Sequence, residues 1–169
     1  MAKVDMGQYD DYGYKTGGHY GYINELGVDV IHCKYNKAKD FSDGLAQVKF
    51  KGKYGYIDKK GNPITPIKYE RESEPFNDGF AAVELNNKFG FIDKTGKEVI
   101  PCIYETADNF NDGLARVEMD EKWGLINTSG NLLLGCTYDD MQKFENGLGK
   151  VKVGTTWVYI DSKGTIYFD

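Results

Sequence analysis

Few residues in this chain have side chains that could carry covalent or metal chemistry. The two histidines are His19 and His32, and the three cysteines are Cys33, Cys102 and Cys136. His32 and Cys33 are adjacent, but neighbours along a strand point to opposite faces, so they do not form a nucleophile and its base. The spacing of these residues does not suit zinc. We therefore expect no metal site.

Two pairs of adjacent carboxylates, Asp10-Asp11 and Asp139-Asp140, are the remaining candidates for catalysis. Paired carboxylates can hydrolyse glycosides, but adjacent pairs are more often solvated turn residues. No glycine-rich loop opens a helix, so no nucleotide cradle is expected. The sequence thus predicts no catalytic residues, no enzymatic activity and no cofactor.

Composition narrows the possible partners. The chain has 169 residues and a formal net charge of −5, which argues against nucleic acid as a partner because that would call for a clustered basic face. No apolar run approaches the roughly 20 residues that a membrane-spanning helix needs. The opening MAKVDMGQYDD has no apolar core of a signal peptide, so we expect a cytoplasmic protein without membrane contact.

The dominant feature of the sequence is an internal repeat. The segment FNDGLARVEMDEKWGLINTSG at 110–130 recurs as FNDGFAAVELNNKFGFIDKTG at 76–96 and as FSDGLAQVKFKGKYGYIDKKG at 41–61, with a weaker copy at 144–164. The glycine after the aromatic residue recurs in steps of 34, 35 and 34 at Gly21, Gly55, Gly90 and Gly124, and Val158 follows after another 34. One register held along the chain indicates a repeat architecture.

The cysteines follow the same register. Cys33, Cys102 and Cys136 each lie two residues before the linker tyrosine of their copy, where another copy has Ile67. A position that accepts cysteine or isoleucine is typical of a small buried apolar slot. We expect these thiols to be reduced core residues.

Each copy reads as three short strands. An Asp-Gly turn such as Asp112-Gly113 comes first, and it is followed by a strand that alternates apolar and polar residues. A polar hairpin tip then leads to a second strand, which is aromatic and apolar on both faces. A turn of the type Asp58-x-x-Gly61 leads to the third strand, which Pro66 or Pro101 should end because proline cannot donate to a ladder. The expected core residues are Ala46, Val48, Ile57, Val83, Ile92, Val117, Ile126 and Val151, and the linker tyrosines and phenylalanines should lie buried between units.

The sequence thus predicts an all-β single domain over residues 1–169, built of five tandem three-stranded antiparallel β-meander repeats of 34–35 residues. The units are expected at about 12–31, 41–65, 76–100, 110–134 and 144–168. Residues 1–11 are expected to form a cap or tail, Tyr12–Tyr14 the first strand, and Thr16-Gly17-Gly18 a hairpin tip that also places His19. We expect an open twisted array, with a five-bladed propeller as the alternative.

Two surfaces are candidates for binding. The aromatic residues Tyr20, Tyr54, Phe89, Trp123 and Trp157 could stack on sugars, but a middle strand favours core packing for them. The outer face of the first strand is expected to be more open and to carry chemistry that varies between copies, as binding faces of repeat proteins do. Its candidate binding residues are Gln47, Lys49, Glu84, Arg116, Glu118, Lys150 and Lys152.

These motifs resemble the bacterial WG-repeat family. The Trp-Gly pair is intact at Trp123-Gly124 and reads Tyr-Gly or Phe-Gly in earlier copies, while Val158 replaces the glycine and Gly149 the usual alanine in the last copy. The resemblance covers about Tyr12 to Phe168 and implies an all-β repeat scaffold. We expect a non-catalytic binding or scaffold protein that recognises a protein or peptide; the alternative is a carbohydrate-binding module, although the repeats of choline- and glucan-binding proteins are shorter, at about 20 residues.

Overall fold

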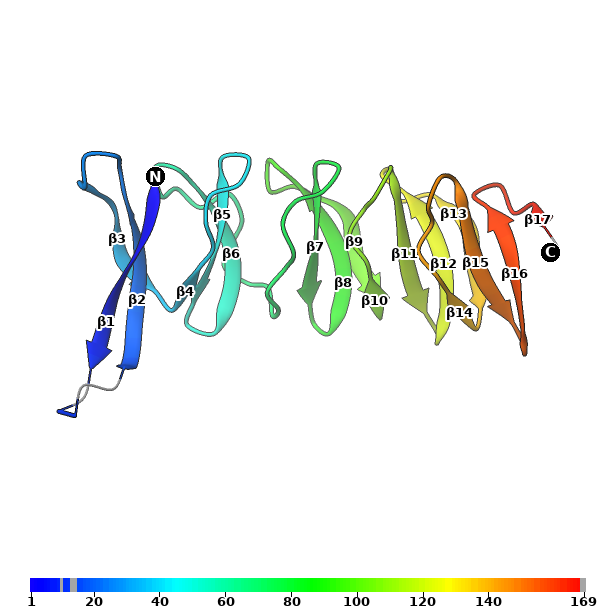
Figure 1. Cartoon of the computed structure of the whole chain (residues 1–169), viewed down its shortest axis with the longest axis horizontal. Helices are drawn as coiled ribbons and strands as arrows, with labels where there is room; N and C mark the ends of the chain where they lie inside the picture. The colour runs from blue at the N-terminus through cyan, green and yellow to red at the C-terminus, as the bar shows by residue number, and fades with distance from the viewer. Residues whose placement is uncertain (10, 13–14, 168–169) are drawn as a thin grey trace. The chain divides into compact units, whose positions relative to one another are not determined.

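The computed structural model describes residues 1–9, 11–12 and 15–167, and these form 17 β-strands and no helix (Figure 1). The strands make several antiparallel sheets of three or four strands, none of which closes into a barrel. The all-β class and the tandem meander are confirmed. No helix that could cross a membrane occurs in this part of the chain.

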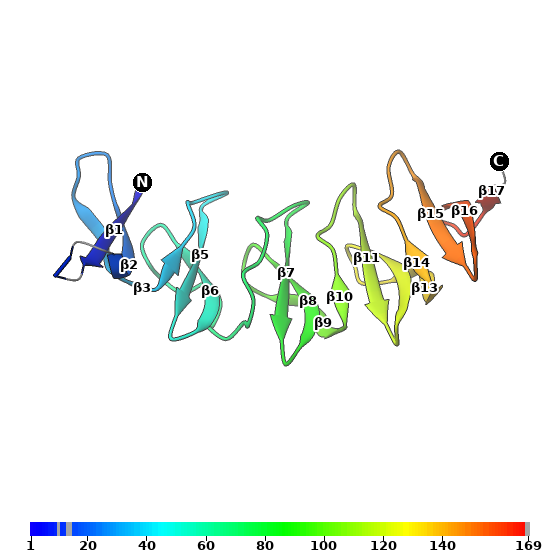
Figure 2. The same cartoon turned by 60° about the horizontal axis from the view of Figure 1, so that its bottom comes forward.

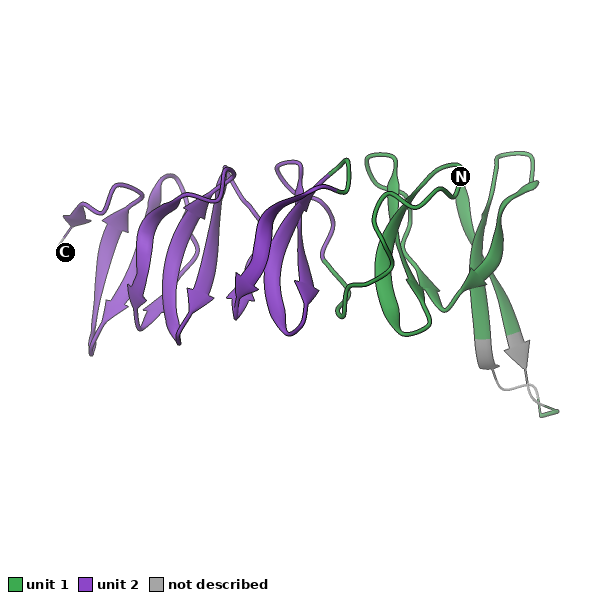
Figure 3. Ribbon diagram, turned by 180° about the vertical axis from the view of Figure 1, so that it is seen from behind, with its two compact units in different colours: residues 1–73, 94–96 green, residues 74–93, 97–169 purple. Residues whose placement is uncertain are grey.

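The chain divides into two compact units, coloured separately in Figure 3. The first comprises 1–73 and 94–96, and the second comprises 74–93 and 97–169. The first unit holds two sheets. Their strands are β1 (Ala2–Tyr9), β2 (Lys15–Ile23) and β3 (Asp29–Tyr35), followed by β4 (Lys37–Ala38), β5 (Leu45–Phe50) and β6 (Lys53–Asp58).

The second unit holds three sheets, each a meander in chain order (Figure 2). The first contains β7 (Phe80–Leu85), β8 (Lys88–Asp93) and β9 (Glu98–Tyr104). The other two contain β10 (Thr106–Ala107), β11 (Leu114–Met119), β12 (Lys122–Asn127) and β13 (Leu132–Tyr138), then β14 (Asp140–Met141), β15 (Leu148–Val153), β16 (Thr156–Asp161) and β17 (Ile166–Tyr167).

The short strands β4, β10 and β14 were not expected from the sequence. Each follows a linker tyrosine by two residues and pairs with the first long strand of the next sheet; Thr106, for example, lies opposite Glu118. The linker tyrosine is thus the last residue of one sheet, and the short strand two residues later is the first strand of the next sheet. Segments of two residues carry too little periodicity to be recognised as strands.

The linker between the second and third copies is the exception. Phe76 lies seven positions after Tyr69, whereas Phe110 lies six positions after Tyr104. This extra residue explains the single repeat step of 35, from Gly55 to Gly90. No strand is assigned between β6 and β7, although bridges join Tyr54 to Tyr69 and Ile57 to Pro63. The boundary between the two compact units falls in this longer linker, after Ser73.

Several N-terminal predictions were wrong. Residues 2–9 are not a tail but the strand β1, which pairs with β2 from Ala2 opposite Ile23 to Met6 opposite His19 and beyond. Residues 16–18, expected as a hairpin tip, and His19 lie inside β2. Tyr12 is an exposed turn residue rather than part of a strand, and Gly13 and Tyr14 lie outside the described residues, as does Phe168 at the expected end of the last unit. The pattern failed here because β1 lacks the motif of the other copies.

The strand phasing, in contrast, is confirmed. All eight expected core residues are at most 1% exposed. Tyr35, Tyr69, Tyr104, Phe110 and Phe144 are buried as expected for linker aromatics, and Phe41, Phe76 and Tyr138 are half-buried. The register of every long hairpin therefore places the apolar set on the core side, since a slip by one residue would have exposed all of it.

The third strands β3, β9 and β13 each carry a two-residue bulge over the repeat glycine. Phe89 pairs with Tyr104 and Phe91 pairs with Ile100, so four steps along β9 match two along β8. The bulge lies against Gly90, where a side chain would clash with the backbone. Pro101 sits in this bulge and does not end the strand as predicted, because a bulged residue does not need to donate to the ladder.

Neighbouring copies within a unit pack through two recurring contacts. The linker phenylalanine packs on the middle-strand aromatic of the preceding copy: Phe41 lies 4.7 Å from Tyr22, and Phe110 lies 4.6 Å from Phe91, measured between ring centroids. The turn glycine covers the third strand of the preceding copy, as Gly130 covers Ile100. These contacts belong to apolar clusters in which buried residues of successive copies pack together.

Candidate functional site

The seven candidate binding residues on the outer face of the first strands, called the binding strip below, are less exposed than expected. Gln47 is buried, with only 4% of its surface exposed, and the other six strip residues are half-buried. Gln47 and Lys49 belong to the first unit, and Glu84, Arg116, Glu118, Lys150 and Lys152 belong to the second. The expectation of an open face failed because short strands and linkers that the sequence did not reveal pack beside the first long strands.

Several cations of the strip cover aromatic rings. Lys49 Nζ lies 5.0 Å from the centre of the Tyr54 ring, and Lys150 Nζ lies 4.4 Å from that of Tyr159. The Arg116 guanidinium lies 5.1 Å from the ring of Trp123. Such cation–π contacts stabilise a cation close to an aromatic face. Two of the covered rings, Tyr54 and Trp123, belong to the five aromatic residues considered for sugar stacking. Of these five, Tyr54 is buried, and Tyr20, Phe89 and Trp123 are half-buried.

Arg116 has a structural role in the second unit. Its Nε donates to Asp108 Oδ2 at 2.7 Å, its Nη2 forms an ion pair with the same oxygen at 2.5 Å, and its Nη1 donates to the carbonyl oxygen of Met141. Asp108 follows β10, and Met141 belongs to β14 of the next sheet. The guanidinium therefore ties two successive sheets together, using several donors that a lysine does not have.

In the second copy the position of Arg116 is occupied by the shorter Gln47, and a pocket of about 220 Å³ lies beside it. The pocket lies within the first unit, between its two sheets. Strand β1 contributes Lys3, β2 contributes Tyr20, and β6 contributes Tyr54; the other lining residues are Lys37, Ala38, Lys39, Gln47, Lys49 and Glu72.

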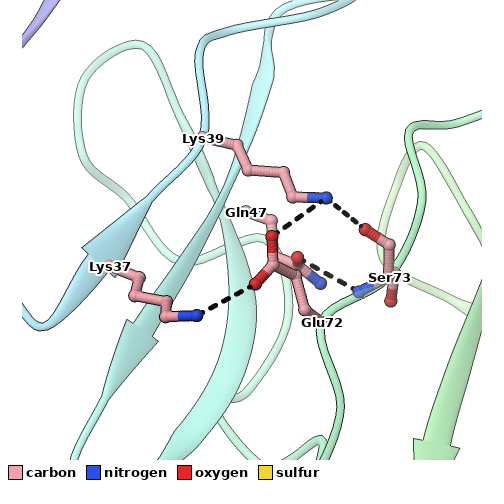
Figure 4. Close-up of polar contacts among 5 residues, drawn as sticks. All are labelled: Lys37, Lys39, Gln47, Glu72 and Ser73. Atoms are coloured by element: carbon pink, nitrogen blue, oxygen red, sulfur yellow. Dashed lines mark hydrogen bonds and ion pairs between the residues drawn. The ribbon is translucent and has the colours of Figure 1, made fainter.

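A network of polar contacts spans one side of this pocket (Figure 4). The Glu72 carboxylate lies 3.4 Å from Lys37 Nζ through one oxygen and 3.3 Å from Lys39 Nζ through the other. Lys39 Nζ also donates to the Ser73 carbonyl oxygen at 2.6 Å, and the Ser73 amide donates to Gln47 Oε1 at 3.2 Å. The longer linker is thereby held against the pocket by charge and by hydrogen bonds.

The lysines change the ionisation of Glu72. Partial burial acts to raise the pKa of this carboxyl, but hydrogen bonding and attraction to Lys39 and Lys37 outweigh it and lower the pKa below its usual value. Glu72 is therefore ionised at neutral pH. Its charge balances only part of the ammonium charge around the pocket.

Sequence reasoning singled out Gln47, Lys49, Tyr20 and Tyr54, but it missed the other lysines of this pocket and Glu72. Lys37 and Lys39 are two residues apart, a spacing that puts side chains on one face when the segment is a strand. The extra linker residue that places Glu72 was visible as the step of 35. Neither signal predicts that β1 brings Lys3 to the same place.

The other chemical candidates lie apart from this pocket. His32 is exposed, with Nδ1 2.7 Å from the Asp29 carboxylate. Asp139 pairs with Lys122 and accepts the Gly154 amide at 2.7 Å, and Asp140 accepts the Met141 amide, so both carboxylates serve local structure. Asp11 is an exposed turn residue, and Asp10 lies outside the described residues.

The cysteine slot is more open than predicted. Cys33, Cys102 and Cys136 are half-buried rather than buried. They lie in the third-strand bulges, where Cys33 and Cys136 place their sulfur atoms over Gly21 and Gly124. The shared position in the repeat thus reflects packing against the middle-strand glycine.

Comparison with known proteins agrees with this repeat architecture. The family model described as "WG containing repeat" matches four times in succession, at residues 20–54, 54–89, 89–123 and 123–157. The matches begin and end at the first aromatic residue of successive middle strands, from Tyr20 to Trp157. No curated protein matches the chain.

Proposed function

Because this chain belongs to the WG-repeat family, whose model matches most of its length, we propose that it is a non-catalytic scaffold that binds a protein or peptide partner. The observation that carries the proposal is a set of exposed aliphatic side chains on third strands. Val30 is 41% exposed on β3, Ile103 is 47% exposed on β9, and Leu133 is 37% exposed on β13.

These strands suit a protein partner for two reasons. Each of β3, β9 and β13 is the last strand of its sheet, so one side of its backbone faces away from the ladder. An extended peptide can add to such an edge through main-chain hydrogen bonds, with apolar side chains providing specificity. Exposed aliphatic residues on an edge that is left open would also invite aggregation, which a partner would prevent.

The carbohydrate alternative receives less support. Stacking on sugars needs exposed aromatic faces. All five aromatic residues considered for it lie in the described part of the chain, and among them Trp157 is the exposed one, at 38%. A single exposed ring gives no ladder. The exposed aliphatic side chains therefore favour a protein or peptide partner over a glycan.

The proposal can be tested by screening the full chain against a displayed peptide library and a glycan array in parallel. We expect peptides with alternating apolar residues to be enriched, and their affinity to fall at least about tenfold in Ile103→Glu and Leu133→Glu, as for loss of a central apolar contact. Ser129→Glu, on an exposed turn, adds the same charge and should change little. Glycan binding without peptide enrichment, or peptides insensitive to both edge variants, would refute the proposal.

A further inference from the structure

The pocket of the first unit concentrates positive charge in an acidic protein. Four lysines, Lys3, Lys37, Lys39 and Lys49, and one acid, Glu72, line it, so its formal charge is 4 − 1 = +3, whereas the whole chain carries −5. Like charges this close repel one another unless an anion lies among them. Asp40 approaches Lys3 at 3.5 Å, but its side chain is 82% exposed and does not line the pocket.

Glu72 already shows how the pocket holds an anion. Its two carboxylate oxygens accept from two different lysines, Lys37 and Lys39, in a bridging arrangement (Figure 4). It is supplied by a linker rather than by a strand of the sheets, and 42% of its side chain is exposed. An exposed carboxylate on a linker can be exchanged for an anion from solution at little cost, since such ion pairs contribute little to stability.

A buried amide points to the same conclusion. Gln47 is 96% buried, its Oε1 accepts from the Ser73 amide, and its Nε2 has no hydrogen-bond acceptor among the described residues. Gln47 lines the pocket, and Figure 4 shows its amide beside Glu72 and Ser73. A buried donor without an acceptor is costly, and native proteins rarely keep one without a reason. An oxygen-rich ligand in the pocket would satisfy it.

We propose that this pocket is a binding site for a phosphoryl group of the phosphomonoester class, and that the Glu72 carboxylate occupies the lysine pair until the ligand displaces it. A phosphomonoester carries a charge of about −1.5 to −2 at pH 7 and has three strong acceptor oxygens. Those oxygens match Lys37, Lys39 and the Gln47 amide donor, and Lys3 and Lys49 balance the remaining charge. Lysine suits phosphate as a compact point charge.

The size of the pocket sets the scale of the ligand. A volume of about 220 Å³ accommodates a phosphoryl group with a short organic portion, and Tyr20 and Tyr54 are among the residues that line this space. The phosphoryl group can come from a free small molecule or from a phosphorylated side chain of a partner. Both sources share the chemistry that the lysines recognise, and the site does not depend on the edge-strand proposal above.

The test is a titration of the full chain with inorganic phosphate, O-phosphoserine, a phosphoserine peptide and its unphosphorylated form, followed by NMR shifts of the pocket residues. We expect saturable binding of the phosphorylated probes, with shifts at Lys37, Lys39 and Gln47. Affinity should weaken as salt increases, because partly exposed charges are screened. If the phosphopeptide binds more tightly than O-phosphoserine, the source of the phosphoryl group is a phosphorylated side chain of a partner. If the two bind with equal affinity, the source is a free small molecule.

Variants distinguish phosphate binding in this pocket from nonspecific attraction of phosphate to surface lysines. Glu72→Gln should tighten phosphate binding about fivefold by removing the internal competitor, the size expected for one partly exposed charge. Lys49→Gln, which leaves the Glu72 contacts intact, should weaken binding, and Lys152→Gln, at the same repeat position but outside the pocket, should not. The proposal fails if phosphate does not bind saturably, if Glu72→Gln weakens binding, or if the two lysine variants behave alike.

Discussion

A Cβ atom on Gly90 would lie 2.5 Å from the carbonyl oxygen of Ile100, where the third strand bulges over the middle strand. A Cβ atom on Gly21 would likewise lie 2.3 Å from the carbonyl oxygen of Ile31, and one on Gly124 would lie 2.8 Å from that of Leu134. The repeat glycine is therefore required by a backbone contact across strands. In the last copy β17 pairs with Tyr159 and Ile160, beyond Val158, which agrees with the loss of the glycine there.

Gly90→Ala should destabilise the protein by about 1–3 kcal/mol, the usual cost of forcing an extra group into a packed site. The clash is with the Ile100 carbonyl, the Cys102 amide and the Pro101 carbonyl carbon, which cannot rotate away as a side chain can. Urea unfolding measures the effect. Gly135→Ala is the control, because its Cβ would meet only the Thr137 methyl group at 3.8 Å. Equal stability of the two variants would contradict the bulge argument.

Ile92→Ala should cost about 2–5 kcal/mol, the range for removing a large apolar side chain from a core. Ile92 is fully buried on the middle strand β8. The matched control is Ile103→Ala, because Ile103 is 47% exposed on the neighbouring strand β9. This variant should lose much less unfolding free energy. Thermal unfolding of both variants makes the comparison, and a larger loss at position 103 would mean that the face assignment is reversed.

Arg116→Lys should destabilise the second unit by about 1–3 kcal/mol, because one ammonium cannot replace the guanidinium's contacts with both Asp108 and Met141. Asp108→Asn should have a similar effect. If the residues act as a pair, the double variant Arg116→Lys/Asp108→Asn will lose less stability than the sum of the losses in the two single variants. A fully additive double-mutant cycle in urea would show that the contact contributes no coupling energy.

Protonation of turn aspartates should lower stability in acid. Hydrogen bonds from Asn62, including one from its side chain, lower the pKa of Asp58, and the amides of Thr165 and Lys163 lower that of Asp161. A carboxyl with a lowered folded-state pKa stabilises the fold above its unfolded-state pKa, near 3.8, and this contribution is lost as the pH falls through the folded-state value.

Asp58→Asn combined with Asp161→Asn should therefore unfold at nearly the same urea concentration as the parent at pH 7, but lose less stability between pH 5 and pH 2. The protein itself uses asparagine at this place: Asn127 Oδ1 accepts the Ser129 and Asn131 amides. Glu25→Gln, an exposed carboxyl in the turn between β2 and β3, is the control. An unchanged acid profile in the double variant would refute the assignment.

Cys136 should react slowly with a thiol reagent at pH 8 and rapidly after denaturation. Burial raises the pKa of the Cys136 thiol, and the Asp120 carboxylate raises it further, so less of the reactive thiolate is present. The thiol is also packed against Gly124. Cys33→Ser/Cys102→Ser isolates Cys136 for this measurement. Labelling as fast in the native as in the denatured state would contradict the packing.

The sequence by itself determined the repeat and its strand phasing. Alternation in Ala46-Gln47-Val48 and its copies specified which face is buried, because a strand has only two faces and a slip by one residue exchanges them. The Asp-Gly turns were equally readable: Asp43 and Gly44 both adopt positive φ, at 51° and 83°, as a two-residue hairpin turn requires. Local chemistry dictates these features.

Tertiary structure decided the rest. Whether Gln47 is open or buried depends on where the Ser73 linker lies, and Pro101 can continue a strand only because the partner strand offers Gly90 beneath it. The lysine pocket combines Lys3 from β1, Lys37 from β4 and Glu72 from a linker, which lie 34 and 35 residues apart in the chain. Side chains so distant share no periodic signal, and only the packing of two sheets brings their charges together.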